Sequence, residues 1–289
     1  VAASLPVYGD PSLRLRVYAD LRNENWNLSE TFSGPAPPTD LNLRRILAGA
    51  EFRAVRNARW SWRAGVEAAN RNFRNASSSL APRERAFFTG GNALAGWMGA
   101  ERTLARVPER RFTVDSSLRA KAGREFAAPL GPFATLQGSL NVHWFPRASG
   151  DDYEMRGRIR SGGTAGKVSL DELFQLGVER DNDLWLRGHA GTIAGRKGAA
   201  LLGRRYFLAN WEMDKNVYRN GIFALKIGPF LDHGAVRDSS GLFGSRTWLW
   251  DTGFEAKVRI LSSVTVVFSY GRGLRGGKGV FYGTVLGAE

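Results

Sequence analysis

The feature that most limits the fold of this chain is a strict alternation of apolar and polar side chains over long segments. In residues 13–21 every second residue is apolar, and residues 60–68, 136–144 and 254–260 follow the same rule with occasional small residues. Side chains on a β-strand point to opposite faces in turn, so each segment has one apolar and one polar face. Helical periodicity is weak throughout. The pattern therefore predicts an all-β protein.

The alternating segments are long and numerous. We count roughly thirteen of them, each about ten residues long, which is the length that crosses a bilayer obliquely. Their centres lie near residues 17, 50, 65, 98, 118, 139, 156, 176, 206, 227, 254, 268 and 283. Glycine, proline and polar turn residues fill the connections at 33–40, 147–152, 238–245 and 275–279. We expect one domain over residues 1–289, with 1–12 as a lead-in segment.

Two architectures share this alternation. Strands of a soluble β-protein average nearer five or six residues, whereas the segments here are longer and carry aromatic residues at their ends. Such aromatic residues are typical of the two interfaces of a membrane. The sequence thus favours a transmembrane antiparallel β-barrel, and a soluble β-domain is the alternative. The aromatic residues are Trp60, Trp144, Phe145, Trp211, Trp248, Trp250, Phe281 and Tyr282.

The chain has 289 residues and a formal net charge of +14, which by itself would suit a nucleic-acid binder. Its arginines, however, alternate with apolar residues instead of gathering in one patch. A charge on the lipid face of a barrel costs about 2–4 kcal/mol at the midplane. We therefore expect a charged, wet lumen and no nucleic-acid partner. The arginines assigned to the lumen are Arg14, Arg16, Arg156, Arg158, Arg160 and Arg259.

Candidate catalytic and metal-binding patterns are weak. Cysteine is absent, and the three histidines, His143, His189 and His233, are each separated by more than forty residues. We expect no enzyme activity, no metal and no cofactor. The acid pairs Asp151–Asp152 and Asp171–Glu172 are interpreted as solvated turn residues.

One glycine pattern also needs an interpretation. Gly271, Gly273 and Gly276 form a G-x-G-x-x-G spacing, but the remaining 13 residues cannot supply the helix and second strand that a dinucleotide fold requires. The glycines are interpreted as the end of a hairpin.

The last third of the chain carries an ordered set of short motifs. "LRGH" at 186–189 matches a [V/I]-R-G-[F/Y] motif, with His189 in place of the usual aromatic residue. Asn210 and Glu212 match an N-x-E pattern, and Phe230, Asp232 and Gly234 match an F-x-D-x-G pattern. In this order, residues 172–286 resemble the C-terminal barrel of the outer-membrane assembly and secretion superfamily. Its members include BamA-like insertases, TamA-like translocation factors and two-partner secretion transporters.

The resemblance implies a structure and a function. The family has sixteen strands and a long loop folded into the lumen, and from both sources we expect about 12–16 strands here. The family usually places periplasmic polypeptide-transport-associated domains before the barrel, and we expect none in this chain. The chain also ends on "GTVLGAE" instead of on the family's terminal Phe. The implied role is to insert or export polypeptides at the outer membrane of a Gram-negative bacterium. The implied partners are membrane lipid, unfolded polypeptide clients and periplasmic accessory proteins.

Strand parity gives an independent indication about the motif residues. In residues 206–214, Phe207, Ala209, Trp211 and Met213 form the apolar face, so Asn210 and Glu212 face the lumen. By the same argument Phe230 and Asp232 also face inward. We predict a latch, in which Arg187 on the infolded loop binds the carboxylates of Glu212 and Asp232 and Gly188 permits a close backbone approach. Leu186, His189, Asn210, Phe230 and Gly234 are the supporting positions.

The end of the chain bears on how the barrel closes. Residues 279–287 read as a short final strand, with Phe281, Gly283 and Val285 as its seam positions. A weak seam between the first and last strands leaves unpaired backbone groups that can pair with an incoming strand. The alternative function is a passive porin or solute channel, which the lumen arginines would make anion-preferring.

Overall fold

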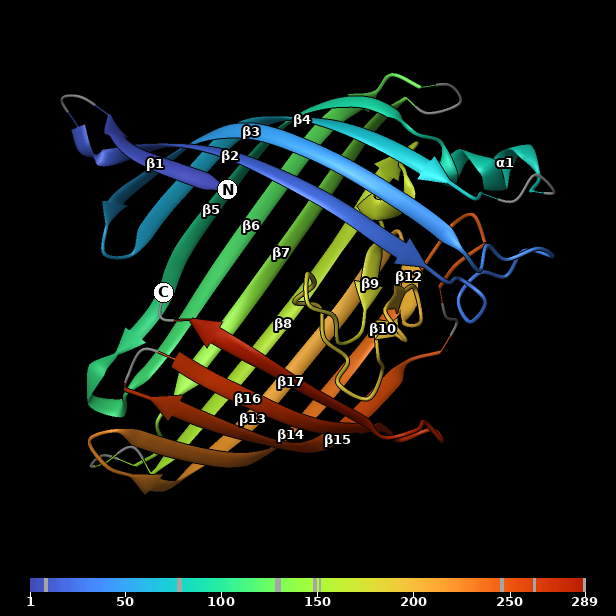
Figure 1. Ribbon diagram of the computed structural model, residues 1–289. Coiled ribbons are helices and arrows are strands. Elements are labelled where there is room, and N and C mark those ends of the chain that lie inside the picture. Colours follow the sequence, from blue (N-terminus) through green and yellow to red (C-terminus); the bar gives the residue numbers. More distant parts are fainter. Residues whose placement is uncertain are drawn as a thin grey trace.

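The computed structural model describes residues 1–7, 10–76, 80–127, 131–147, 150, 152–244, 247–261 and 264–287. Within these ranges, twelve long antiparallel strands form the wall of a barrel (Figure 1). They are β2 (Asp10–Trp26), β3 (Leu41–Asn57), β4 (Trp60–Arg74), β5 (Gly91–Val107), β6 (Phe112–Glu125), β7 (Pro132–Trp144), β8 (Tyr153–Gly166), β13 (Arg205–Arg219), β14 (Phe223–Arg237), β15 (Leu249–Ile260), β16 (Val264–Gly273) and β17 (Val280–Gly287).

The predicted segments match this wall with one exception. Twelve of the thirteen centres lie in wall strands. The segment near residue 176 does not cross the barrel but forms β9 (Phe174–Leu176), a short strand in the connection between β8 and β13. Residues 173–179 are buried on every side instead of on alternate faces, because this segment packs inside the lumen. The described strands number fewer than the family's sixteen but fall within the expected 12–16.

The two faces of the wall differ as the alternation predicts. Large apolar side chains such as Leu21, Met98 and Phe254 are more than half exposed on the outer face. On the inner face, charged side chains pair with one another, for example Arg16 with Glu51. Exposed apolar surface this extensive is unusual for a protein that stays in water and is typical of a lipid-facing band.

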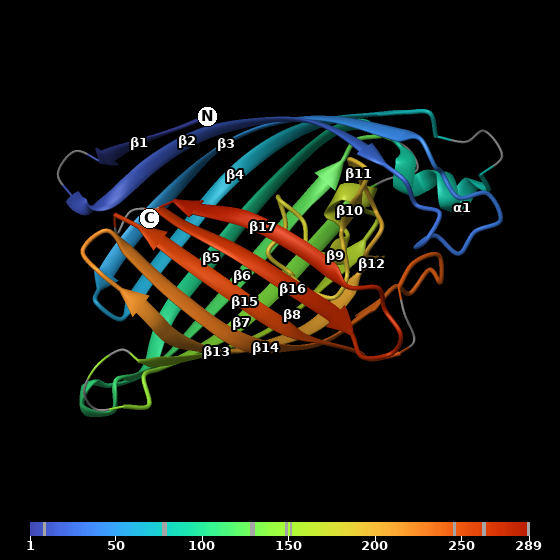
Figure 2. The same ribbon diagram turned by 60° about the horizontal axis from the view of Figure 1, so that its bottom comes forward.

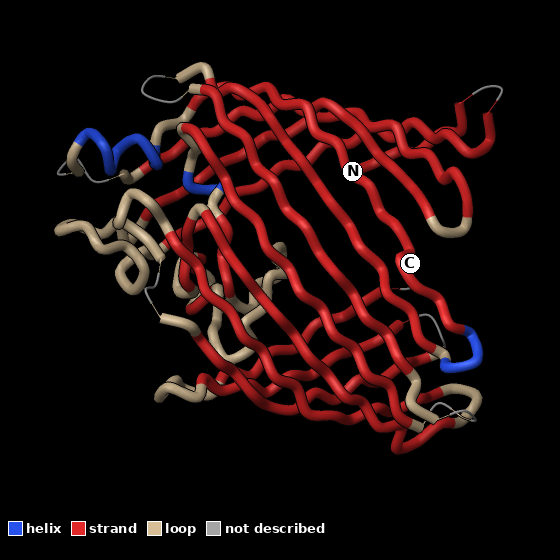
Figure 3. Tube along the Cα trace, turned by 180° about the vertical axis from the view of Figure 1, so that it is seen from behind, coloured by secondary structure: helices blue, strands red, loops and turns tan. Residues whose placement is uncertain are grey.

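The two ends of the barrel also differ. The turns after β3, β5 and β13 are short, whereas the longer connections gather at the opposite end (Figure 3). Among the described residues, helical structure is limited to α1 (Pro82–Arg85) and the 3₁₀ turns η1 (Ala86–Phe88), η2 (Pro108–Arg110) and η3 (Leu170–Glu172). In the described ranges, no helix has the length and hydropathy that a membrane crossing requires. In barrels of the bacterial outer membrane, short turns face the periplasm and long loops face outward.

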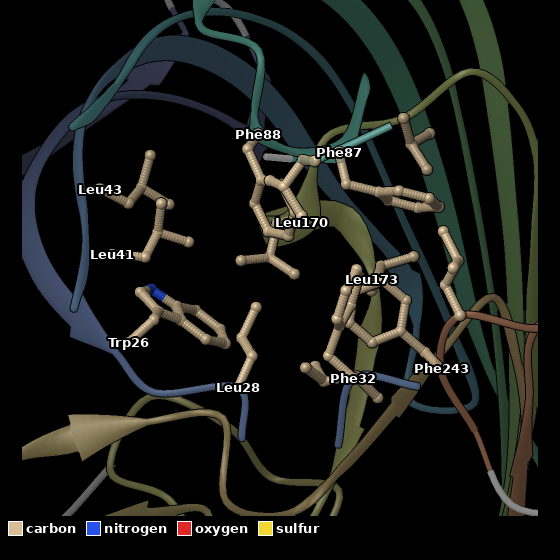
Figure 4. Packing of buried hydrophobic residues seen from close by; sticks show 14 of the residues in the cluster. Trp26, Leu28, Phe32, Leu41, Leu43, Phe87, Phe88, Leu170, Leu173 and Phe243 are labelled. Atoms are coloured by element: carbon tan, nitrogen blue, oxygen red, sulfur yellow. The ribbon is translucent and has the colours of Figure 1, made fainter. Parts of the chain in front are cut away.

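An apolar cap fills the end of the barrel that carries the long connections (Figure 4). It combines side chains from four connections with inward-facing residues at the strand ends, and Phe32 packs edge-on against Phe243 with ring centroids 5.4 Å apart. The cap therefore covers this end with a buried apolar core. Its members are Trp26, Leu28, Phe32, Leu41, Leu43, Leu80, Phe87, Phe88, Ala95, Phe133, Val168, Leu170, Leu173, Leu202, Leu242 and Phe243.

The connection between β8 and β13, residues 167–204, folds into the lumen (Figure 2). It contains β9, β10 (Thr192–Ile193), β11 (Arg196–Lys197) and β12 (Leu201–Gly203). β9 pairs with β12 and β10 with β11. β11 also pairs with the wall, since Lys197 lies beside Trp26 of β2 in parallel orientation. We call residues 167–204 the lumen loop.

The sheet is open at one place. Each wall strand from β2 to β17 pairs with the next, but among the described residues no ladder joins β17 to β2 or to the N-terminal strand β1 (Ala2–Val7). Figure 1 shows β1 and β2 facing β17 across this opening, which we call the seam. The segment 1–12, expected as a lead-in, contains β1 and the start of β2.

Candidate functional site

Buried apolar residues fix the part of the lumen loop that carries Arg187. Leu186 is fully buried among Leu184, Leu176 and wall residues of β13 and β14. A backbone hydrogen bond from His189 N to Leu186 O, 3.0 Å long, closes a turn around Arg187. The neighbouring apolar side chains therefore hold the loop against the wall, and the turn directs the guanidinium toward β13, β14 and β15.

Arg187 binds carboxylates on three consecutive wall strands. Its Nε and Nη2 donate to the two oxygens of Asp232 at 2.9 and 2.6 Å, in the bidentate geometry that only arginine provides. Its Nη1 donates to Glu212 at 2.6 Å and to Glu255 at 2.8 Å. The Arg187 side chain is only 2% exposed. Burial lowers the pKa of Arg187, but the carboxylates, Asp232 first, outweigh this effect and hold the pKa above its usual value.

The supporting motif residues complete this environment. Phe230 lies under the guanidinium, with Arg187 Cζ 3.8 Å from the ring centroid. Asn210 donates to Asp232 at 2.7 Å and to the Trp185 carbonyl at 2.8 Å. The latch residues named from the sequence are therefore in contact with one another. At Gly234, an added Cβ would lie 3.0 Å from the Phe207 carbonyl oxygen, so a side chain there would crowd the neighbouring strand.

Gly188 and His189 contact a residue that the motifs do not include. Asp251 on β15 accepts a hydrogen bond from Gly188 N at 2.6 Å, and His189 Nδ1 lies 3.0 Å from the same oxygen. At Gly188, an added Cβ would lie 2.7 Å from Asp251 Cγ and 2.6 Å from Gly273 N. Gly188 is therefore required for close approach, as predicted from its position beside the arginine.

Glu255 and Asp251 are the site residues that sequence reasoning missed. Glu255 lies on the polar face of the alternating segment 254–260, so strand parity already placed it in the lumen. Nothing in the spacing indicated that Arg187 would reach a third strand. Lys257 shares two of these acids with Arg187, since its Nζ lies 2.7 Å from Glu212 and 3.2 Å from Glu255, and it also contacts Asp214 at 2.9 Å.

The glycines of the 271–276 pattern have a second role besides ending a hairpin. An added Cβ at Gly271 would meet the Arg187 carbonyl group, with Arg187 C at 2.5 Å and Gly188 N at 3.0 Å. Gly273 contacts the loop through its backbone, because a Cβ added at Gly188 would lie 2.6 Å from Gly273 N. Bare backbone on β16 therefore lets the loop lie close enough for Arg187 to reach the wall.

We expect Gly271→Ala to displace the loop and lower the stability of the folded barrel by about 1–3 kcal/mol, the usual cost of overpacking. Gly96→Ala on β5 is the matched control, because the nearest atom to its added Cβ is Gly65 O at 3.9 Å. Urea unfolding in detergent or lipid measures both variants. Equal stability of the two would contradict the close-approach role of Gly271.

A second ionic contact holds the beginning of the lumen loop. Asp171 and Glu172 accept from Arg71 of β4 at 2.8 and 2.6 Å, and Glu172 also accepts from Lys121 of β6 at 2.7 Å. Arg45 of β3 lies 3.3 Å from Asp171. The interpretation of Asp171–Glu172 as solvated was wrong, because the turn folds into the lumen and buries both acids against wall bases. We call Arg71, Asp171 and Glu172 the second anchor.

The remaining predicted positions lie away from the latch. Phe281 and Val285 point outward from β17 and are more than half exposed, and Gly283 pairs with Phe268 of β16. His143 Nε2 lies 2.6 Å from Glu154, and His233 makes stacked contacts with both Trp248 and Trp250. In the part of the chain that the structure describes, no three His, Asp or Glu side chains are grouped so as to hold a metal ion. Asp151 lies outside the described residues, and Asp152 pairs with Arg147.

Comparisons with known proteins place this barrel among solved structures. A crystal structure of BamA from Haemophilus ducreyi lacking POTRA domains 1–3 matches with a TM-score of 0.68 and 11% sequence identity, over 99% of this chain and 61% of that one. CdiB from Escherichia coli matches with a TM-score of 0.66 and 12% identity, over 98% of this chain and 51% of that one. CdiB from Acinetobacter baumannii matches with a TM-score of 0.57 and 12% identity, over 94% of this chain and 47% of that one.

The likeness is one of fold. No protein-family model matches the chain, and no curated protein matches it by sequence. The chain spans about three-fifths of the BamA structure and about half of each CdiB structure. Its antiparallel barrel with an infolded loop has the fold of the BamA and CdiB barrels, as the motifs at 186–234 predicted.

Proposed function

We propose that this chain, which has the barrel fold of BamA and CdiB, is an outer-membrane barrel that assembles or exports polypeptides through its seam and performs no chemistry of its own. The observation that carries the proposal is the combination of an unpaired seam with a lumen loop fastened to the wall by a buried arginine. A barrel that only separates two compartments needs no open edge. An unpaired strand edge, in contrast, can accept a further strand by backbone hydrogen bonds.

The lumen loop contacts both sides of the seam from inside. On one side, Lys197 binds Glu24 of β2 at 2.8 Å, and its carbonyl accepts from Asn27 N. On the other side, Trp185 packs edge-on against Tyr282 of β17, with ring centroids 5.4 Å apart. We infer that the loop holds the two seam strands at a defined separation while the rest of the wall stays rigid.

The apolar cap supports a lateral route. It buries side chains such as Leu28, Phe88 and Leu170 over the end of the lumen that carries the long connections. A polypeptide moving along the barrel axis would have to break this packing, whereas one that pairs at the seam would not. Of the two roles, insertion through the seam is therefore favoured over export along the axis.

Assembly of a client into vesicles tests the proposal. The chain is reconstituted in phospholipid vesicles and mixed with a urea-denatured eight-stranded outer-membrane barrel as the client. We expect the client to gain heat-modifiable gel mobility and protease resistance faster than in vesicles that hold an unrelated porin at the same protein-to-lipid ratio. Equal client folding in the two preparations would contradict the proposal.

The second candidate, an anion-preferring channel, is favoured by the net charge of +14. Two observations weigh against it. Of the six arginines assigned to the lumen, Arg16, Arg156, Arg158 and Arg160 are paired with acids. The lumen loop also occupies part of the space that a conducting pore would need, and it lines two cavities of about 600 and 410 Å³. Planar-bilayer recordings separate the candidates: the proposal predicts small, erratic currents, and a large, steady, anion-selective conductance would favour the channel.

A further inference from the structure

The outer edge of β2 is already occupied by another part of this chain. β1 runs antiparallel to β2, with Ala2 beside Tyr18 and Leu5 beside Leu15. At the far end of this pairing, the amino group of Val1 donates to Ala19 O and the amide of Ala19 donates to Val1 O, both at 2.9 Å. A strand that added to β2 at these residues would have to replace β1.

The hydrogen-bonding pattern shows which groups β1 leaves free. Val1 and Ala19 exchange both backbone hydrogen bonds, and such pairs alternate along an antiparallel ladder. The backbone N–H and C=O groups of the odd-numbered residues of β1 therefore point toward β2, and those of the even-numbered residues point toward the seam. The seam-facing positions are thus Ala2, Ser4 and Pro6. Pro6 has no N–H to donate, and proline on an edge strand blocks further pairing. β1 therefore covers the edge of β2 and presents a poor edge itself.

β1 is held by far less structure than the strand on the other side of β2. It pairs with residues 10–18 of β2, whereas β3 pairs with residues 13–26. The ladder of β1 is irregular between Pro6 and Val7. Leu5 is 64% exposed and packs under no second layer. A six-residue edge strand with these features opens at a low free energy compared with the core of the sheet.

Strand direction separates β1 from the wall. Each of the twelve wall strands is antiparallel to its neighbour, so β17 runs antiparallel to β2 and parallel to β1, as Figure 1 shows. β17 can therefore complete an antiparallel barrel only with β2, and only where β1 is absent. Within the described residues, the seam is open and β1 is in place.

We propose that β1 is a resident strand that occupies the strand-binding edge of β2, and that it must leave before an extended segment of a polypeptide client pairs there. The inference rests on the function proposed above and adds a competitor that belongs to the chain itself. The partner that fits this edge is an extended polypeptide antiparallel to β2, because its backbone would take over the bonds that Ala19 and its odd-numbered neighbours now make with β1. A client strand with free N–H groups throughout would pair over more of β2 than β1 does.

A disulfide lock tests the proposal, since the chain has no cysteine of its own. Ser4→Cys with Arg16→Cys joins β1 to β2 at a non-hydrogen-bonded pair, where Cα atoms lie about 4.5 Å apart and a disulfide fits. We expect client assembly by the oxidised variant to fall at least about tenfold, because only the small unlocked fraction remains competent. Reduction should restore it. Equal rates in the oxidised and reduced states would overturn the proposal.

Two controls accompany the lock. Ser117→Cys with Ser139→Cys joins β6 to β7, away from the seam, where the two hydroxyls lie 2.8 Å apart. This disulfide should leave assembly unchanged. Arg16→Cys alone reports the loss of the Arg16–Glu51 ion pair. If the unmodified chain assembles no client at all, the proposed function fails; if it does and the lock has no effect, only the resident-strand inference fails.

Hydrogen exchange gives a second measurement that needs no substitution. The amides of Val17 and Ala19 face β1, whereas those of Arg16 and Tyr18 face β3. When the denatured client is added to the unmodified chain, we expect the first two amides to pass through a state of faster exchange and the other two to remain protected. Unbroken protection of Val17 and Ala19 during productive client assembly would also overturn the proposal.

Discussion

Replacing Arg187 with alanine is expected to lower the stability of the folded barrel by about 3–5 kcal/mol, the loss typical when one partner of a buried ionic cluster is removed. The substitution leaves Asp232 buried without its ion-pair partner, and Glu212 and Glu255 then share Lys257 as their remaining ion-pair partner. The loop also loses the side-chain bonds that join it to three strands at once. Client assembly should fall with stability, while the protein still reaches the membrane.

Heat-modifiable gel mobility and urea unfolding measure this effect. Arg158→Ala is the matched control, because Arg158 is 44% exposed and pairs with the exposed Asp183, so its loss should cost no more than about 1 kcal/mol. Arg187→Lys should recover only part of the stability, because an ammonium cannot bind Asp232 through two parallel hydrogen bonds. An Arg187→Ala barrel as stable as the Arg158→Ala barrel would exclude the latch.

Replacing Arg71 with alanine is expected to have an effect of similar size, about 3–5 kcal/mol, at the beginning of the lumen loop. Its side chain is 3% exposed and contacts Asp171, Glu172 and Glu125. Arg63→Ala on the same strand is the control, since Arg63 is 43% exposed and pairs with an exposed glutamate. If the Arg71→Ala and Arg63→Ala variants unfold at the same urea concentration, the second anchor contributes no stability.

The latch and the second anchor bind separate strands: Arg187 binds β13, β14 and β15, and the acids of the second anchor bind bases on β3, β4 and β6. The losses in the double variant Arg187→Ala, Arg71→Ala should therefore add to within about 0.5 kcal/mol. A double variant no less stable than either single one would show that the loop detaches as one unit.

The second anchor also predicts a dependence on pH. Burial raises the pKa of Asp171, but Arg71 and Arg45 outweigh it and hold the pKa below the ordinary value of 3.8. A carboxylate with a lowered folded-state pKa contributes stability above its unfolded pKa, and this contribution is lost as the pH falls through the folded value. Between neutral pH and about pH 2, Arg71→Ala should therefore lose less stability than the unmodified chain does.

Much of the barrel could be predicted because its determinants are local. Alternation in segments such as 13–21 and 254–260 depends only on which side of a strand each side chain takes, so twelve wall strands and their inner faces follow from the sequence. The same parity placed Glu212 and Asp232 in the lumen, where the structure has them. The segment near residue 176 was misassigned because an apolar stretch in a lumen loop and a wall strand look alike along the chain.

Alternation along the chain therefore predicts the all-β fold and the two faces of its wall, and the motifs together with strand parity predict the pairing of Arg187 with Glu212 and Asp232. The folded chain was needed to show that Glu255 joins them, that Asp171 and Glu172 are buried against Arg71, and that β1 covers the first half of the β2 edge. These contacts join residues far apart in the chain, such as 71 with 171. They depend on the path of the loop through the lumen and on the side of the seam that each strand takes. Sequence periodicity predicts neither, because it indicates which face of a strand a side chain takes and not which residue of another segment it contacts.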